Sequence, residues 1–218
     1  MRKTRVFLAD DHRVVIEGIK SALSEHPEFE IVGEALNGRD AVKKSEILKP
    51  DIVILDISMP ELNGINVTIH LKEISPDIGI IVFTMYSDEE YVIDLFEAGI
   101  SAYVLKEDHM SELIMALNAV RSGSIYFSGV VKKIIQQHLK NLTKGKKRQK
   151  DAFRDLSLRE REVFQLLIKG FSIKDIAGKL DISPKTVESH KYNLMEKLNA
   201  DTFADLTRIA IKKKLLDL

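Results

Sequence analysis

Short β-branched runs alternate with helix-length amphipathic stretches over the first 121 residues, and this alternation constrains the fold more than any other feature of the chain. The runs cover residues 5–9, 30–35, 52–56, 80–84 and 102–105. Parallel strands need crossover connections, usually helices, so the pattern indicates five βα units with helices on both faces of one sheet. We therefore expect an α/β domain with a doubly wound, five-stranded parallel sheet.

Charge separates this part of the chain from the rest. The formal net charge is zero, but residues 1–130 hold 12 Lys and Arg against 22 Asp and Glu, and residues 131–218 hold 21 against 11. The parts therefore carry −10 and +10, which suggests an acidic module joined to one that binds a polyanion. The alternative is that the basic excess is only a solvated surface. A lysine-rich polar segment, 141–151, is expected to be the linker.

Composition excludes several classes of protein. The chain has no Cys, so it has no disulfide framework, no thiolate nucleophile and no zinc site that uses sulfur. Its apolar runs, such as 52–55 and 80–83, are far shorter than the roughly 18 residues of a membrane-spanning helix. The N-terminal residues lack the apolar core of a signal peptide. We therefore expect a cytoplasmic protein that does not contact a membrane.

Polar side chains follow most of the predicted strands. Asp10 and Asp11 follow the first, Asp56 closes the third, Thr84 closes the fourth and Lys106 follows the fifth. Taken singly, each has an ordinary explanation: Asp11 as a helix cap, Thr84 as a strand former and Lys106 as a solvated cation. Together they should meet at one edge of the sheet, where three carboxylates repel unless a cation lies among them. An all-oxygen site favours Mg²⁺.

These residues lie in motifs that together resemble the receiver domains of bacterial two-component response regulators. The motifs are Leu8-Ala9-Asp10-Asp11-His12, Ile54-Leu55-Asp56-Ile57-Ser58-Met59-Pro60 with Asn63-Gly64, Phe83-Thr84, and Ser101-Ala102-Tyr103-Val104-Leu105-Lys106. The resemblance implies a flavodoxin-like sheet in which Asp56 accepts a phosphoryl group from a sensor histidine kinase. It also implies Mg²⁺ held by Asp10, Asp11, Asp56 and the backbone carbonyl of Ser58.

The resemblance implies a switch as well. Lys106 and Thr84 bind the phosphoryl group, and the ring of Tyr103 turns inward as Thr84 moves towards that group. For Tyr103 the residues alone favour an ordinary strand aromatic. Two positions depart from the commoner pattern, because Met85 stands where a small residue is frequent and Glu107 stands where Pro is frequent. Met85 puts the lifetime of the phosphorylated state in question.

The basic part of the chain carries helix-start signals in quick succession. Ser157 begins a capping-box spacing, Ser172 precedes an apolar-periodic stretch, and Ser183 precedes Pro184. They predict helices over 158–169, 173–180, 184–198 and 202–214. Short helices joined by tight turns in a basic domain suggest a helix-turn-helix. By itself, the exposed polar face of 184–198 leaves DNA contact no better than even.

Three segments resemble the LuxR-type DNA-binding domain, and together with the receiver motifs they make the chain similar to the NarL/FixJ class of response regulators. They are Leu156-Ser157-Leu158-Arg159-Glu160-Arg161-Glu162-Val163, Gly170-Phe171-Ser172 with Ile176-Ala177, and Ser183-Pro184-Lys185-Thr186-Val187-Glu188-Ser189-His190. The resemblance implies base contacts from Glu188, Ser189 and Tyr192. It places near phosphates Lys174, Lys185, Thr186, His190, Lys191 and Asn193. Glu188 stands where a basic residue is frequent; since Glu can accept from cytosine N4, altered specificity is expected.

The prediction for the whole chain is a phosphorylation-controlled transcription factor, not an enzyme. Residues 1–125 form the receiver, 126–152 a connecting helix and basic linker, and 153–218 the DNA-binding domain. Phosphorylation would release the basic domain from the acidic one, favour a homodimer on promoter DNA, or both. RNA polymerase is a further candidate partner. In the last helix, Leu206, Ile209 and Ala210 are expected either to contact the dimer partner or to pack in the core.

Two other classes of protein share parts of this pattern. A phosphohydrolase of the haloacid dehalogenase type needs a second Asp two residues after the first, and this chain has Ser58 there. An output domain that binds RNA or only protein would be excluded by sequence-specific binding to duplex DNA.

Overall fold

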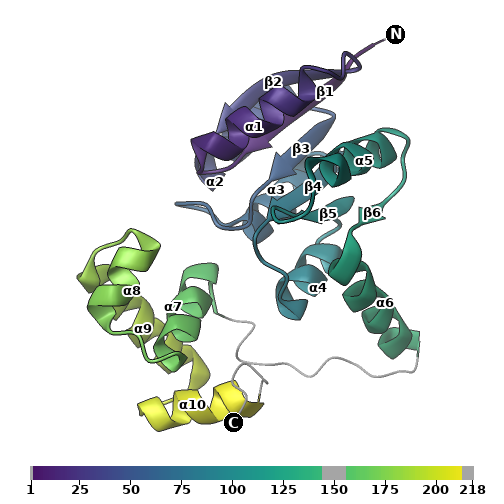
Figure 1. The fold of residues 1–218 in the computed structure, drawn as a ribbon. Coiled ribbons are helices and arrows are strands. Elements are labelled where there is room, and N and C mark those ends of the chain that lie inside the picture. Colours follow the sequence, from purple (N-terminus) through teal and green to yellow (C-terminus); the bar gives the residue numbers. More distant parts are fainter. Residues whose placement is uncertain (1, 144–155, 213–218) are drawn as a thin grey trace. The chain divides into compact units, whose positions relative to one another are not determined.

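The computed structural model describes residues 2–143 and 156–212, and the chain divides into two compact units, Met1–Lys147 and Arg148–Leu218 (Figure 1). Much of the predicted linker, residues 144–151, lies outside the described residues, as do the last two residues of the helix expected over 202–214.

The first unit alternates strands and helices as the sequence predicts, and each predicted strand lies within one residue of the observed one at either end. The strands are β1 Thr4–Ala9, β2 Phe29–Ala35, β3 Ile52–Leu55, β4 Gly79–Thr84, β5 Ala102–Leu105 and β6 Tyr126–Phe127. The helices are α1 Arg13–Leu23, α2 Gly38–Leu48, α3 Gly64–Ile74, α4 Glu89–Glu97, α5 Met110–Arg121 and α6 Gly129–Thr143.

The strands form one parallel sheet in the order β2-β1-β3-β4-β5-β6, so the doubly wound fold is confirmed. The sheet has one strand more than the five expected. β6 pairs with β5 through only two residue pairs, Ala102 with Tyr126 and Tyr103 with Phe127. A strand of two residues shows no alternation of apolar and polar side chains, and so it leaves no periodic signal.

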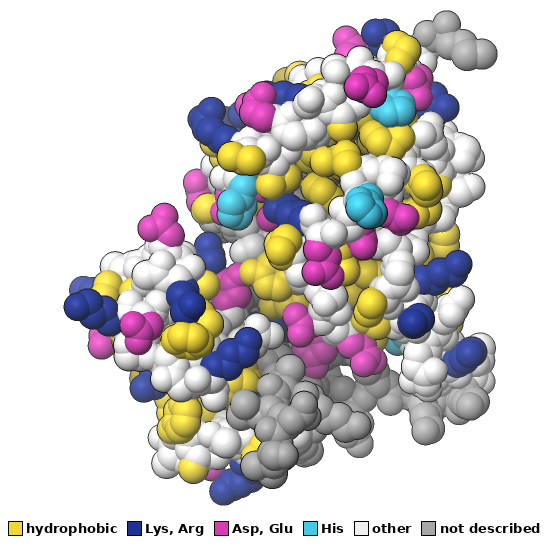
Figure 2. Space-filling view, viewed as in Figure 1, with side chains coloured by type: hydrophobic (Ala, Val, Ile, Leu, Met, Phe, Trp, Pro, Cys, Tyr) yellow, Lys and Arg dark blue, Asp and Glu magenta, His cyan; other side chains and the backbone are white. Residues whose placement is uncertain are grey.

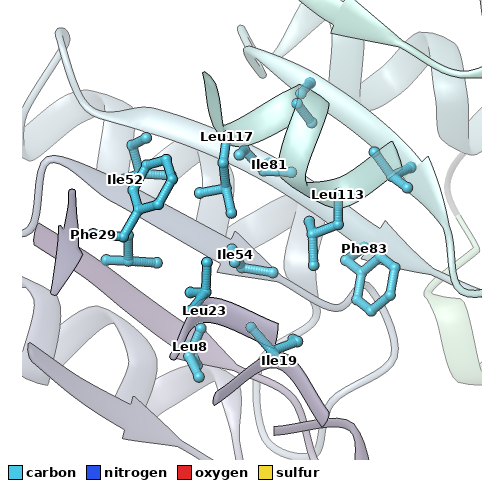
Figure 3. Close-up of a cluster of buried hydrophobic side chains, with 14 of the residues drawn as sticks. Leu8, Ile19, Leu23, Phe29, Ile52, Ile54, Ile81, Phe83, Leu113 and Leu117 are labelled. Carbon is cyan, nitrogen blue, oxygen red and sulfur yellow. The ribbon is translucent and has the colours of Figure 1, made fainter. Parts of the chain in front are cut away.

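Apolar side chains from α1 and α5 fill one face of the sheet (Figure 3). Ile19 and Leu23 of α1 pack with Leu113 and Leu117 of α5 against strand residues such as Ile54. β3 is buried along its whole length, as expected for a central strand covered on both faces. This packing holds the carboxyl ends of the central strands in a fixed register.

Helix α6 belongs to the first unit. Its buried residues Val131, Ile135 and His138 recur at helical spacing, and the helix packs against α4. The edge of the His138 ring meets the ring of Phe96 in α4, with the centroids 6.3 Å apart. The predicted connecting helix therefore exists, and at least its described part packs on the α/β domain.

The second unit consists of α7 Leu158–Ile168, α8 Ile173–Leu180, α9 Pro184–Leu198 and α10 Phe203–Lys212. Ser157, Ser172 and Ser183 cap α7, α8 and α9, and each side chain accepts a backbone N–H three residues on. Asp181 has a left-handed backbone, which ends α8 and turns the chain into α9. The resulting α8–turn–α9 pair is the predicted helix-turn-helix.

Candidate functional site

Polar side chains gather at the carboxyl edge of the sheet, where the strand order reverses between β1 and β3. β1 pairs with both β2 and β3, so Asp10 after β1 and Asp56 after β3 lie on neighbouring strands. In doubly wound sheets this reversal is the usual place for a functional site. Asp10 is 3% exposed and Asp56 is 4% exposed, so both carboxylates are removed from bulk water.

Lys106 connects the two buried carboxylates. Its Nζ lies 2.7 Å from Asp10 Oδ2 and 2.7 Å from Asp56 Oδ2. The other oxygens are also engaged: Ile57 N donates to Asp56 Oδ1 at 2.7 Å, and His12 N donates to Asp10 Oδ1 at 2.9 Å. The loops after β1, β3 and β5 therefore hold one cation against two anions.

Lys106 does not fully compensate the negative charge at this edge. Burial and the neighbouring charge of Asp56 raise the pKa of Asp10, although hydrogen bonds and charge from Lys106 act the other way. Burial lowers the pKa of Lys106, but the charges of Asp56 and Asp10 outweigh it, so its pKa is raised above 10.5. The site therefore holds charged groups that a further cation would stabilise.

Asp11 and His12 complete the acidic cluster. Oxygen or nitrogen atoms of Asp10, Asp11, His12 and Asp56 all lie within 4.8 Å of one another. The imidazole Nδ1 of His12 is 2.8 Å from Asp11 Oδ1 and 3.3 Å from Asp10 Oδ1. The alternative of Asp11 as a helix cap is wrong, because α1 starts at Arg13 and His12 occupies the cap position. His12 is not among the predicted site residues. The sequence feature that points to it is its position directly after Asp10 and Asp11.

Thr84 is the last residue of β4 and Tyr103 is the second residue of the neighbouring strand β5, and both are fully buried. Among the described residues, the hydroxyl oxygen of Thr84 has no hydrogen-bond partner, an unusual state for a buried polar atom. The Tyr103 ring is turned inward, and its hydroxyl donates to the backbone oxygen of Tyr86 at 2.7 Å. Burial raises the pKa of this hydroxyl well above its ordinary value, so it remains a donor.

The remaining predicted positions lie in the loops around this site. Ser58 is half-buried two residues after Asp56. Met85 is 65% exposed, so most of its side chain lies in solvent. Glu107 is exposed, and the described residues contain no cis peptide bond, so the bond between Lys106 and Glu107 is trans.

Helix α9 presents the predicted DNA-contacting side chains on the surface of the second unit. Val187, Leu194 and Leu198 are buried against the other helices, which leaves the opposite face in solvent. Tyr192 is 71% exposed. The predicted contact residues that are also exposed are Lys174, Lys185, Thr186, Glu188, Ser189 and Asn193. Figure 2 shows Lys and Arg side chains spread over the visible surface of this unit.

Two of the predicted contacts are only half-exposed, namely His190 and Lys191. Burial lowers the pKa of His190, although the charge of Glu160 on α7 acts against it. Burial therefore favours the neutral form of the ring, which can donate or accept a hydrogen bond.

The burial of α10 favours core packing over a dimer contact for two residues. Leu206 and Ala210 are both fully buried in the hydrophobic cluster of the second unit, and Ile209 packs against that cluster half-buried. Packing within the second unit therefore explains why apolar residues recur at helical spacing at Leu206, Ile209 and Ala210. The larger exposed apolar side chains of α10 are Phe203 and Ile211.

Comparison with known families matches both units. Residues 6–118 match the response regulator receiver domain, and residues 154–210 match the bacterial regulatory proteins of the luxR family. The oxygen regulatory protein NreC of Staphylococcus carnosus is 37% identical over 215 residues, covering 98% of this chain and 99% of that protein. NreC of Staphylococcus aureus is 34% identical over the same share of both chains.

Solved structures resemble the chain over nearly its whole length. RcsB from Salmonella enterica serovar Typhimurium, bound to a promoter in the presence of phosphomimetic BeF₃⁻, aligns with a TM-score of 0.61 at 28% identity and covers 95% of this chain and 97% of that one. A structure of two RcsB dimers bound to two parallel DNAs aligns with a TM-score of 0.59 at 28% identity, over the same shares of both chains.

The doubly wound unit with its acidic edge and the helix-turn-helix unit define a response-regulator transcription factor. The chain belongs to the family of two-component response regulators that join a receiver domain to a LuxR-type DNA-binding domain. Within the described residues, no helix has the length and apolar character needed to span a membrane.

Proposed function

We propose that Asp56 is the phosphoacceptor of this regulator and that its phosphorylation controls the binding of promoter DNA by residues 153–218. On this reading, residues 1–125 receive the phosphoryl group and residues 126–152 transmit the change. The observation that carries the proposal is the contact of Lys106 with Asp56, beside a buried Thr84 hydroxyl that lacks a partner among the described residues.

Each of these groups has a task in phosphoryl transfer. A carboxylate oxygen of Asp56 forms a bond to phosphorus as the P–N bond of a sensor kinase phosphohistidine breaks. Lys106 then neutralises charge on the phosphoryl oxygens, and the Thr84 hydroxyl donates a hydrogen bond to one of them. The hydroxyl thereby gains the partner that the described residues do not provide.

The acidic cluster fits Mg²⁺, because oxygen ligands and several retained waters are what this ion prefers. Asp10, Asp11, Asp56 and the backbone carbonyl of Ser58 would hold it. Burial and the charge of Asp56 raise the pKa of Asp10, and a bound cation would oppose both effects. When bound, Mg²⁺ supplies positive charge against the transferring phosphoryl oxygens.

The output follows from the second unit. Exposed groups of α9 would enter the major groove, where Glu188, Ser189 and Tyr192 meet base edges. The residues that would lie near phosphates are Lys174 of α8 and, on α9, Lys185, Thr186, His190, Lys191 and Asn193. The regulator would act as a homodimer on two half-sites, in the cytoplasm where promoter DNA and RNA polymerase are found.

The test is DNA selection from a pool of genomic fragments, with and without acetyl phosphate and Mg²⁺. The native chain is compared with Asp56→Ala, and with Asp77→Ala as a control that removes an exposed carboxylate. We expect selective binding that the phosphodonor strengthens in the native chain and in Asp77→Ala but not in Asp56→Ala. Selective binding that ignores both donor and Asp56 would overturn the role of phosphate.

A further inference from the structure

Helix α6 starts at a junction that is hydrogen-bonded to β5 and to the loop that follows β5. Ser128, the residue before the helix, is 3% exposed. Its backbone N donates to the carbonyl of Tyr103 at 3.1 Å, and its hydroxyl donates to Asp108 Oδ2 at 2.7 Å. The start of α6 is therefore tied to the strand that carries Tyr103 and to the loop that follows it.

Asp108 also shapes the loop that carries Lys106. Its Oδ2 accepts from Leu105 N at 3.2 Å, and its own backbone N donates to Leu105 O at 3.0 Å. These two bonds close the turn around Lys106, whose backbone N donates to Thr84 O at 2.8 Å. One carboxylate oxygen therefore closes the lysine turn and accepts the Ser128 hydroxyl.

A second contact joins α6 to the helix that follows Thr84. His138 is 6% exposed, and its Nε2 lies 3.3 Å from Glu97 Oε1 of α4. The Phe96 ring of α4 meets both His138 and Phe127 edge-on, with centroids 6.3 and 5.9 Å apart. Helix α6 therefore touches the segments that follow both Thr84 and Lys106, the two residues expected to bind the phosphoryl group.

We propose that Asp108 is a positioning residue that joins the phosphoryl site to α6, by fixing the turn that presents Lys106 and by holding Ser128 at the start of the helix. The inference rests on the proposed function of Asp56 and adds the route from that site to the connecting helix. When Lys106 shifts its contact from the carboxylates to a phosphoryl group, the Asp108 turn moves with it. The Ser128 hydrogen bond passes that movement to α6.

The first experiment measures hydrogen exchange of the backbone amides of residues 129–135 in the full chain without any ligand. Ser128→Ala removes only the link to α6, and Ser124→Ala removes an exposed serine four residues earlier. Because a hydrogen bond to a charged group contributes enough for roughly a tenfold change in local opening, we expect Ser128→Ala to raise exchange about tenfold and Ser124→Ala to leave it unchanged. Equal exchange in both variants would overturn the link.

The second experiment measures phosphorylation by acetyl phosphate and Mg²⁺ affinity separately. Asp108→Ala should slow phosphorylation roughly tenfold, because misplaced catalytic groups lose rate steeply, while Mg²⁺ affinity stays within about twofold. Asp108→Asn keeps an oxygen acceptor and should recover part of the rate. Glu107→Ala removes an exposed carboxylate from the same turn and should match the native chain.

The two experiments separate the inference from the proposed function. If the native chain is phosphorylated and Asp108→Ala behaves like Glu107→Ala, the inference is wrong and the function of Asp56 stands. If the native chain takes up no phosphoryl group and binds no BeF₃⁻, the proposed function fails and the signalling role of Asp108 fails with it. A general loss of stability would lower phosphorylation and Mg²⁺ affinity together, which also contradicts the proposed positioning role.

Discussion

At the scale of single residues, two buried threonines of the first unit differ in one respect that bears on function. Thr68 donates its hydroxyl to Gly64 O at 2.8 Å, whereas the Thr84 hydroxyl has no partner among the described residues. Thr84→Val should therefore leave the free energy of unfolding unchanged or raise it by up to about 1 kcal/mol, while Thr68→Val lowers it by about 1 kcal/mol. Binding of BeF₃⁻ should weaken only in Thr84→Val.

Urea unfolding and calorimetric titration with BeF₃⁻ and Mg²⁺ check this pair. If Thr84→Val binds BeF₃⁻ as tightly as the native chain does, Thr84 does not contact the phosphoryl group.

Gly64 is a residue that the geometry of the site requires. A Cβ there would lie 2.5 Å from Asp56 O and 2.8 Å from Ile57 Cα, both backbone atoms that cannot easily move. Gly64→Ala should cost about 1–3 kcal/mol of stability and weaken Mg²⁺ binding, because the displaced backbone begins at Asp56. Gly18→Ala is the matched control. Apart from its chain neighbours and the nearby backbone of α1, no atom of the described residues lies within 4 Å of its Cβ position in the middle of α1, so Gly18→Ala should gain about 0.5–1 kcal/mol. Thermal unfolding and a Mg²⁺ titration measure both effects, and unchanged Mg²⁺ affinity in Gly64→Ala would contradict this account.

At the scale of elements, the start of α7 is held to α9 by one buried carboxylate. Glu160 accepts from Ser157 N at 2.6 Å in a capping box and from Lys197 Nζ at 2.7 Å. Burial raises the pKa of Glu160, but the hydrogen bonds from Lys197 and Ser157 outweigh it, so its pKa lies below 4.5. The charged form is therefore favoured by folding. Its contribution is fully present above pH 4.5 and is lost as the pH falls through the lower folded pKa.

Glu160→Gln should remove that part of the pH dependence. We expect the variant to be about 1 kcal/mol less stable at pH 7 and to show a flatter stability curve below pH 4.5, where the native unit loses stability. Glu196→Gln, at an exposed position on α9, should keep the native slope. Urea unfolding followed through the NMR methyl signals of Ala200 and Leu206 reports on this unit alone. Equal slopes in all three proteins would show that Glu160 is not the titrating group.

Elements with a clear period or cap could be predicted from the sequence, and contacts between elements could not. Strands such as β3 are continuous apolar runs, and Ser157, Ser172 and Ser183 mark helix starts by local chemistry. The meeting of Asp10, Asp56 and Lys106 also follows from the sequence, since parallel strands end at one edge of a sheet. The link from Asp108 to Ser128 could not be predicted, because it joins side chains 20 positions apart whose partners depend on tertiary packing.

At the scale of the whole molecule, the charge division allows two ways for phosphorylation to raise DNA affinity. Met1–Lys147 holds 18 Lys and Arg against 22 Asp and Glu, and Arg148–Leu218 holds 15 against 11, so the two units carry −4 and +4. Phosphorylation would either end an electrostatic attraction between them or favour a dimer. Salt separates the two, since the screening length falls from about 10 Å at 0.1 M to about 6 Å at 0.3 M. Total affinity for DNA falls with salt in either case, because counterions are released from the same phosphates.

We expect dimerisation to dominate, as the proposed function has the regulator act as a homodimer on two half-sites. The ratio of DNA affinities with and without BeF₃⁻ should then stay constant within about threefold between 0.1 and 0.3 M salt. With or without BeF₃⁻, the bound complex contains two chains that contact the same phosphates. Binding with BeF₃⁻ should also rise steeply with protein concentration, as two chains join one operator. Fluorescence anisotropy of a labelled operator at both salt concentrations measures the ratio. A ratio that collapses towards one at 0.3 M, with binding curves of single-site shape, would instead assign the control to attraction between the acidic and basic parts.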